Sequence, residues 1–220
     1  ALAMTWHLVH FHYVKFNKES MYEVSKKIIL LCIPLLLSAQ FIAGILNEAL
    51  DLTDTNQELF ISMSHNIFGV LSIAIVVPIL EEVLFRGAIE GHLLRKGWSP
   101  KWAILVSALI FGIIHGNPAQ IPFAFLIGLL FGWLYYRTGS LVPGIVGHII
   151  NNSFGAWTMF TATREELSQT TMETLGTTIT YILLVLAIIV FIGMYLYLNK
   201  YLPKPTNIQV KAINEQDITI

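Results

Sequence analysis

Long apolar stretches are the feature that most restricts how this sequence can fold. Hydrophobic residues make up 55% of its 220 residues and charged residues only 12%, whereas an ordinary soluble domain carries about 25% charged residues. A helix needs about 20 predominantly apolar residues to cross a bilayer. Six stretches have this character, at residues 28–46, 67–94, 102–115, 120–136, 141–160 and 177–198. We therefore expect an all-α fold, a polytopic transmembrane bundle of about six spanning helices.

The expected transmembrane domain covers residues 28–198 and is flanked by a shorter segment on each side. Residues 1–27 combine aromatic side chains with lysines, and aromatic residues favour the headgroup zone. We expect an interfacial segment there or, because the chain begins with Ala1, the tail of a cropped helix. We expect no metal site at the three histidines of this segment, His7, His10 and His12. Residues 199–220 are polar and contain two prolines, as expected of a soluble tail.

Positive charge is unevenly distributed over the expected loops. With six spans, both termini and the turns at 95–101 and 137–140 lie on one side. They hold 11 of the 13 Lys and Arg residues, all except Arg86 and Arg164. Because Lys and Arg are enriched in cytoplasmic loops, this distribution places both termini in the cytoplasm. The net charge of −1 gives no general attraction to nucleic acid, and we expect no such partner.

The second apolar stretch contains two adjacent carboxylates and an arginine. A charged residue at the bilayer centre costs about 2.5–3.5 kcal/mol, so each is a candidate functional residue. Glu82 and Arg86 are four residues apart and share a helix face, so they can form an ion pair that supports the site. Glu81 points about 100° away from Glu82. The pattern predicts that Glu81 faces a polar cavity inside the bundle.

Polar side chains on two other stretches can meet Glu81. His115 ends the third stretch, and Glu81 and His115 are each 17 residues from Trp98 in the intervening turn. Antiparallel helices of equal rise place these two residues at one depth, where they can touch. His148 and Asn152 are four residues apart on the fifth stretch, so they share a face. We expect all four polar side chains to surround one cavity.

The second helix is expected to be irregular and to extend beyond the bilayer. Pro78 removes a backbone donor and clashes with the carbonyl of Ala74, which disturbs the helix. His148 lies only about seven residues, roughly 10 Å, into its own span. It therefore meets Glu81 only if the second helix continues into the cytoplasm, a position that suits its polar residues Arg86, Glu90, His92, Arg95 and Lys96.

This set of side chains indicates a hydrolytic reaction. A carboxylate removed from water is a stronger general base, and Glu81 with His115 can deprotonate a water for attack on a carbonyl. His148 and Asn152 can donate hydrogen bonds to the developing oxyanion, typically worth a few kcal/mol. The sequence has neither a serine nucleophile elbow nor a His-Glu-x-x-His zinc motif. We predict a water-activated peptidase, in which Asn151 lies on a different face and packs or caps.

The sequence resembles a known family at three ordered motifs: Glu81-Glu82-x-x-x-Arg86, Phe111-x-x-x-His115 and His148-x-x-x-Asn152. They resemble the motifs of the CAAX protease and bacteriocin-processing (CPBP, or Abi) family. Its members are intramembrane glutamic endopeptidases related to the Ras-converting CAAX endopeptidase. The run from Gly132 to Leu141 also resembles bacterial members. The resemblance covers residues 67–152, the expected core of the domain.

The resemblance implies a function for the site residues. Glu81 and His115 would activate the water, His148 and Asn152 would form the oxyanion site, and the neighbouring ion pair would support them. The family's mechanism is metal-independent, so we expect no metal and no cofactor. The implied substrate is a membrane-associated or lipid-modified peptide, cleaved near the cytoplasmic leaflet of a bacterial cell membrane. The implied roles are peptide maturation, pheromone or bacteriocin processing, and self-immunity.

Two alternatives remain open from the sequence. A non-catalytic membrane scaffold can retain the motifs while it binds a kinase, a toxin or an envelope enzyme. Alternatively, Glu81, His115 and His148 can fill three positions around a zinc ion and leave the fourth to water. Loss of function on replacement of Glu81 separates the first alternative from a peptidase, and chelation tests the second.

Overall fold

The computed structural model describes Trp6, His10 and residues 24–202, and within these residues it is all-helical, without strands. Most of segment 1–27, with His7 and His12, and the tail from residue 203 lie outside the described residues. Five long helices are α2 (Lys26–Glu48), α7 (Pro100–Ile114), α8 (Ile121–Thr138), α9 (Val142–Thr161) and α12 (Thr177–Tyr201). A sixth, continuous helix consists of α4 (Ile67–Leu71), η1 (Ser72–Val76), α5 (Val77–Glu82), η2 (Val83–Glu90) and α6 (Gly91–Arg95).

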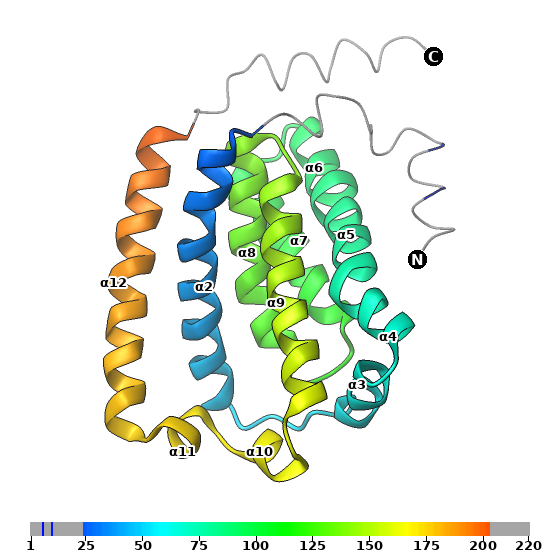
Figure 1. The fold of residues 1–220 in the computed structure, drawn as a ribbon. Coiled ribbons are helices and arrows are strands. Elements are labelled where there is room, and N and C mark those ends of the chain that lie inside the picture. Colours follow the sequence, from blue (N-terminus) through cyan, green and yellow to red (C-terminus); the bar gives the residue numbers. More distant parts are fainter. Residues whose placement is uncertain (1–5, 7–9, 11–23, 203–220) are drawn as a thin grey trace.

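The long helices run roughly alongside one another, with the short connecting helices at one end of the bundle (Figure 1). Among the described residues, four helices are long and apolar enough to cross a membrane: α2, Ile67–Arg95, α8 and α12. Each matches one of the stretches expected to span. The other two expected spans also form helices, but α7 has only 15 residues, and α9 carries the polar residues of the third motif.

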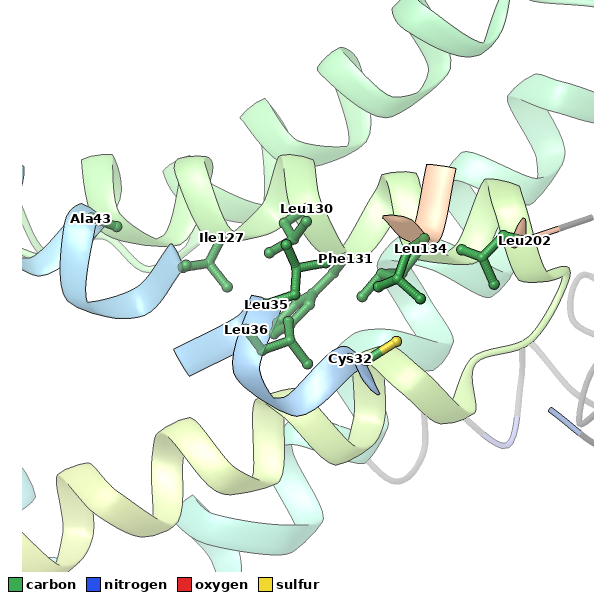
Figure 2. Close-up of a cluster of buried hydrophobic side chains, with 10 residues drawn as sticks. Cys32, Leu35, Leu36, Ala43, Ile127, Leu130, Phe131, Leu134 and Leu202 are labelled. Atoms are coloured by element: carbon green, nitrogen blue, oxygen red, sulfur yellow. The ribbon is translucent and has the colours of Figure 1, made fainter. Parts of the chain in front are cut away.

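The hydrophobic core lies between α2, α8 and α12. Its centre is formed by Leu35 and Leu36 of α2 against Phe131 and Leu134 of α8, all nearly inaccessible to solvent (Figure 2). Cys32 is buried in the same cluster, as its place in an apolar stretch predicts. This core anchors α8, which supports one wall of the cavity described below.

Small residues let α7 and α8 approach closely. A methyl group at Gly128 would lie 3.1 Å from the Phe111 ring and 3.2 Å from the Ala108 side chain. The small residue spacing of Gly128 and Gly132 is typical of tight helix contacts in membranes. At Gly132 the neighbour is different, because a methyl group there would lie 2.6 Å from a carboxylate oxygen of Glu90.

The second helix is irregular on the N-terminal side of Pro78, as predicted. In η1 the backbone forms i→i+5 hydrogen bonds, and the N–H of Val77 donates to the carbonyl of Ser72. Proline lacks an N–H, so it cannot donate to Ile73, the next carbonyl in this pattern. Wide helical turns of this kind are frequent at functional sites. Here the wide turn exposes a carbonyl in the interior of the bundle.

Three short helices in the polar loops are not predicted from apolar periodicity: α3 (Gln57–Ser64), α10 (Arg164–Ser168) and α11 (Thr171–Leu175). Thr163 with Glu166, and Thr170 with Glu173, form capping boxes at α10 and α11. The hydrogen bonds from each threonine lower the pKa of the paired glutamate. The spacing Thr-x-x-Glu is visible in the sequence and signals both helix starts.

The last long helix, α12, continues to Tyr201, three residues beyond the predicted end of the sixth apolar stretch. Arg137, at the end of α8, donates to the backbone carbonyls of Asn199 and Leu202, each at 2.9 Å. A basic side chain on the last carbonyls of a helix satisfies acceptors that have no partner within the helix. Arg137 thereby links the end of α8 to the end of α12.

Candidate functional site

A cavity of about 320 Å³ lies between α3, η1, α5, α7, α8 and α9. The polar side chains on its walls include those predicted from sequence, Glu81, His115, His148 and Asn152, together with Asn151. Most of the remaining lining is apolar: Phe60, Met63, Ile73, Val77, Phe111, Phe123, Ala124, Ile127, Phe131, Ala156 and Met159. The fold thus brings side chains from three separate motifs to one apolar cavity that holds few polar groups, as ligand sites commonly do.

His148 lies between the two adjacent carboxylates of the first motif. Its Nε2 is 3.4 Å from Glu81 Oε2, and its Nδ1 is 3.2 Å from Glu82 Oε1. The Glu81 side chain retains 23% of its exposure, whereas that of Glu82 retains 1%. The carboxylates therefore differ as helix geometry predicts: Glu81 faces the cavity and Glu82 the protein interior. The sequence does not reveal that both carboxylates contact His148.

His115 shares the cavity with Glu81, consistent with their predicted common depth. Its Nδ1 is 2.8 Å from the carbonyl oxygen of Phe111. A carbonyl oxygen only accepts, so Nδ1 carries the hydrogen and a neutral ring has its lone pair on Nε2. The ring of Phe111 also contacts both histidines edge-on, with centroids 5.0 Å from His115 and 5.7 Å from His148. Phe111 thereby fixes the orientation of two cavity residues.

The predicted ion pair between Glu82 and Arg86 is present and buried, with Nη1 of Arg86 2.9 Å from Oε1 of Glu82. The other terminal nitrogen donates to the carbonyl of Gly128 at 3.1 Å. The guanidinium also lies 4.5 Å from the centre of the Phe111 ring, within the range of a cation–π interaction. Arg86 thus connects α8 and α7 to the carboxylate that holds His148.

The amide of Asn152 fills the gap that Pro78 leaves in the second helix. Its Nδ2 donates to the carbonyl of Ile73 at 3.1 Å. That carbonyl is the one exposed by the wide turn η1. On the other side of the amide, Asn151 Nδ2 donates to Asn152 Oδ1 at 3.0 Å. Asn151 lies about 100° around the helix from Asn152, yet it also lines the cavity, which its interpretation as a packing or capping residue does not include.

Glu90 and Arg86 do not approach the solvent at the end of the second helix. Both side chains are fully buried, each with 0% exposure. The charges of both residues are therefore enclosed within the protein, and the extension of the second helix into the cytoplasm stays a prediction. Neither carboxylate oxygen of Glu90 has a hydrogen-bond partner. The charge pattern alone does not predict that the carboxylate of Glu90 is buried against Gly132.

The cavity extends from the middle of the bundle toward the end that carries the short helices. Phe60 and Met63 of α3 and Met159, near the end of α9, line it at that end. Figure 1 shows α3, α10 and α11 at the end opposite to the start of α2 and the end of α12. The loops there carry mainly acidic residues. The cavity therefore extends toward the acidic end, opposite to the end that the charge distribution is expected to place in the cytoplasm.

The three residues considered as zinc ligands, Glu81, His115 and His148, do not form a metal-binding group. Within the part of the chain that the structure describes, no three His, Cys, Asp or Glu side chains form a group able to hold a metal ion. Instead, His148 is engaged by two carboxylates and His115 by a backbone carbonyl. The geometry places Glu81 and His115 on the wall of an open space and leaves Nε2 of His115 available to accept a proton.

Comparisons with known proteins find one matching family and several relatives. Residues 63–154 match the Rce1-like family of type II CAAX prenyl endopeptidases. The chain is 38% identical over 81 residues to YdiL of Bacillus subtilis (strain 168), whose name marks it as an inferred membrane peptidase; the match covers 37% of this chain and 33% of YdiL. It is 33% identical over 106 residues to the membrane-embedded CAAX protease MroQ of Staphylococcus aureus (strain USA300), covering 46% and 42%.

A third relative is the UPF0177 protein YxdF of Lactococcus lactis subsp. lactis (strain IL1403), 28% identical over 122 residues, with 55% of this chain and 63% of the relative covered. The matches thus span between 33% and 63% of the length of these relatives. No solved structure shows a significant match. The family match at residues 63–154 contains all three motifs and most of the residues that line the cavity.

Proposed function

We propose that the chain is an intramembrane, metal-independent glutamic endopeptidase of the Rce1-like family of type II CAAX prenyl endopeptidases, because residues 63–154 match that family. The observation that carries the proposal is the convergence of Glu81, His115, His148 and Asn152 on one cavity. A reacting peptide bond in this cavity would lie against a carboxylate, an imidazole with an available lone pair, and amide donors. This combination supplies the groups that direct water attack requires.

In the proposed reaction, Glu81 and His115 hold the attacking water. Glu81 accepts a proton as the water oxygen bonds to the carbonyl carbon, while Nε2 of His115 orients the water through its lone pair. Glu81 then transfers this proton to the amide nitrogen as the C–N bond breaks, so the amine leaves and the carboxylate returns to its initial state. General-base catalysis of this kind typically contributes about 10²–10⁴ in rate.

His148 and Asn152 stabilise the negative charge that develops on the carbonyl oxygen. Glu82 holds Nδ1 of His148, so the ring is oriented before substrate binds. When His148 carries protons on both nitrogens, Nε2–H donates to the oxyanion in place of Glu81. Asn152 uses one amide hydrogen on Ile73, and its second hydrogen is available to the substrate. Donors fixed before the reaction need no reorganisation in the transition state.

The substrate is proposed to be a membrane-associated or lipid-modified peptide, because most of the cavity lining is apolar. We propose a bacterial cell membrane as the location, with α7 and α9 completing six spans and both termini cytoplasmic. Peptide maturation, pheromone or bacteriocin processing, or self-immunity is the proposed role. Residues 1–27 and the polar tail would flank the membrane domain 28–198, in which the site residues belong to the core 67–152.

The proposal is tested by comparing the peptides of cells that carry the wild-type chain with those of cells that carry Glu81→Gln. The matched control is Glu165→Gln, an identical exchange at an exposed position in α10. Mass spectrometry should show a precursor peptide that accumulates with Glu81→Gln and not with the control, at equal amounts of inserted protein. Identical peptide profiles together with a full cellular phenotype would support the non-catalytic scaffold instead.

A further inference from the structure

We propose that Asn151 is a positioning residue that fixes the side-chain amide of Asn152 in the orientation needed for catalysis. This inference rests on the proposed function, in which Asn152 donates to the oxyanion. Both amides line the cavity beside Glu81 and His148. They do so although they are adjacent in α9, where neighbouring residues point in different directions.

Two hydrogen bonds determine the orientation of the Asn152 amide: its nitrogen donates in one and its oxygen accepts in the other. An asparagine amide has two donor hydrogens on nitrogen and an acceptor oxygen, which exchange places when the amide rotates. The carbonyl of Ile73 only accepts, so it requires the nitrogen of Asn152, 3.1 Å away. The oxygen of Asn152 then points away from Ile73, and Asn151 Nδ2 donates to it at 3.0 Å.

The first of these contacts depends on the irregular second helix. Val77 donates to Ser72 in the i→i+5 pattern, and Pro78 has no hydrogen for the carbonyl that follows. The carbonyl of Ile73 therefore lacks a donor from its own helix and takes the amide of Asn152. Asn151 provides the second contact. Together they hold one hydrogen of Asn152 on Ile73 and leave the other for substrate.

Removal of the donor at Asn151 should reduce transition-state stabilisation without weakening substrate binding. In Asn151→Ala the oxygen of Asn152 loses its donor, and the amide can rotate to present oxygen to the substrate. One hydrogen bond lost from the transition state corresponds to roughly a tenfold decrease in kcat, with KM unchanged. Asn151→Leu, which keeps the side-chain size but has no donor, should show the same decrease.

A double-mutant cycle distinguishes positioning from a structural or direct role. We would measure kcat and KM of purified protein in liposomes for Asn151→Ala, Asn152→Ala and the double variant, with the exposed Ser153→Ala as control. Positioning predicts that Asn151→Ala has no further effect when Asn152 is already alanine. Additive effects, or full activity of both Asn151 variants, would overturn the inference.

The proposed function has its own readout in the same experiment. Normal activity of Asn152→Ala would show that Asn152 does not stabilise the oxyanion. The inference about Asn151 would then fail as well. An inactive Asn152→Ala with a fully active Asn151→Ala would retain the proposed function and refute the inference alone. If Asn151→Ala does not insert, Asn151→Leu completes the cycle, because its size preserves packing within the helix.

Discussion

Glu82 holds two buried side chains with one oxygen atom. Its Oε1 lies 2.9 Å from Arg86 Nη1 and 3.2 Å from His148 Nδ1. Glu90, two turns further along the same helix, is equally buried but has no hydrogen-bond partner on either oxygen. The two glutamates are thus similar in location and different in what they contact.

This difference predicts opposite effects of the same substitution. Glu82→Gln leaves the buried charge of Arg86 without its partner, which typically costs about 3–5 kcal/mol. Glu90→Gln removes a carboxylate that has no hydrogen bond, so stability should be unchanged or increased. Thermal unfolding of both variants in one detergent measures the effects. Equal destabilisation by the two substitutions would contradict this account of the buried charges.

At the scale of elements, the irregular helix Ile67–Arg95 connects Pro78 to the site. Pro78→Ala restores a backbone donor that can bond to the carbonyl of Ile73 and compete with Asn152. We expect stability that is unchanged or higher, together with a decrease in kcat of about tenfold. Thermal unfolding and cleavage rates measure the two effects.

The control for this prediction is Pro100→Ala, because Pro100 begins α7, where a missing N–H costs nothing. Pro100→Ala should leave kcat unaltered. Retained activity in Pro78→Ala would show that the wide turn does not position Asn152.

The sequence predicts the long elements better than the site. Apolar length locates the six long helices to within a few residues, and the spacing of Glu82 and Arg86 predicts their pairing. Helix periodicity cannot reveal that His148 contacts both carboxylates, because this contact depends on how α9 packs against α5. It also does not reveal that Asn151 lines the cavity, or that Glu90 is buried where Gly132 leaves room for its carboxylate.

At the scale of the whole molecule, the two ends of the bundle differ in charge, and the cavity extends toward the acidic end. The end with α3, α10 and α11 carries acidic loops, in which Arg164 pairs with Glu58, and this ion pair lowers the pKa of Glu58. Since Lys and Arg favour cytoplasmic loops, we expect the acidic end, and the cavity that extends toward it, to face away from the cytoplasm.

Single-cysteine labelling tests this orientation. In a chain with Cys32→Ala, we expect an impermeant maleimide to label Glu165→Cys in intact cells and Lys96→Cys only after the cells are opened. Glu165 lies in α10 and Lys96 directly follows α6. Figure 1 shows these two helices at opposite ends of the bundle, so each position is the control for the other. The reverse labelling pattern would place the cavity on the cytoplasmic side.

The most direct test of the central claim is the cleavage rate of the purified protein in liposomes, measured on the peptide found to accumulate in cells. We predict that Glu81→Gln lowers kcat by about 10²–10⁴, that Glu165→Gln leaves it unchanged, and that a chelator does not affect the wild type. A cleavage rate of Glu81→Gln within twofold of the wild type would contradict catalysis by Glu81. Complete loss of wild-type activity on chelation, restored by zinc, would contradict the metal-independent mechanism.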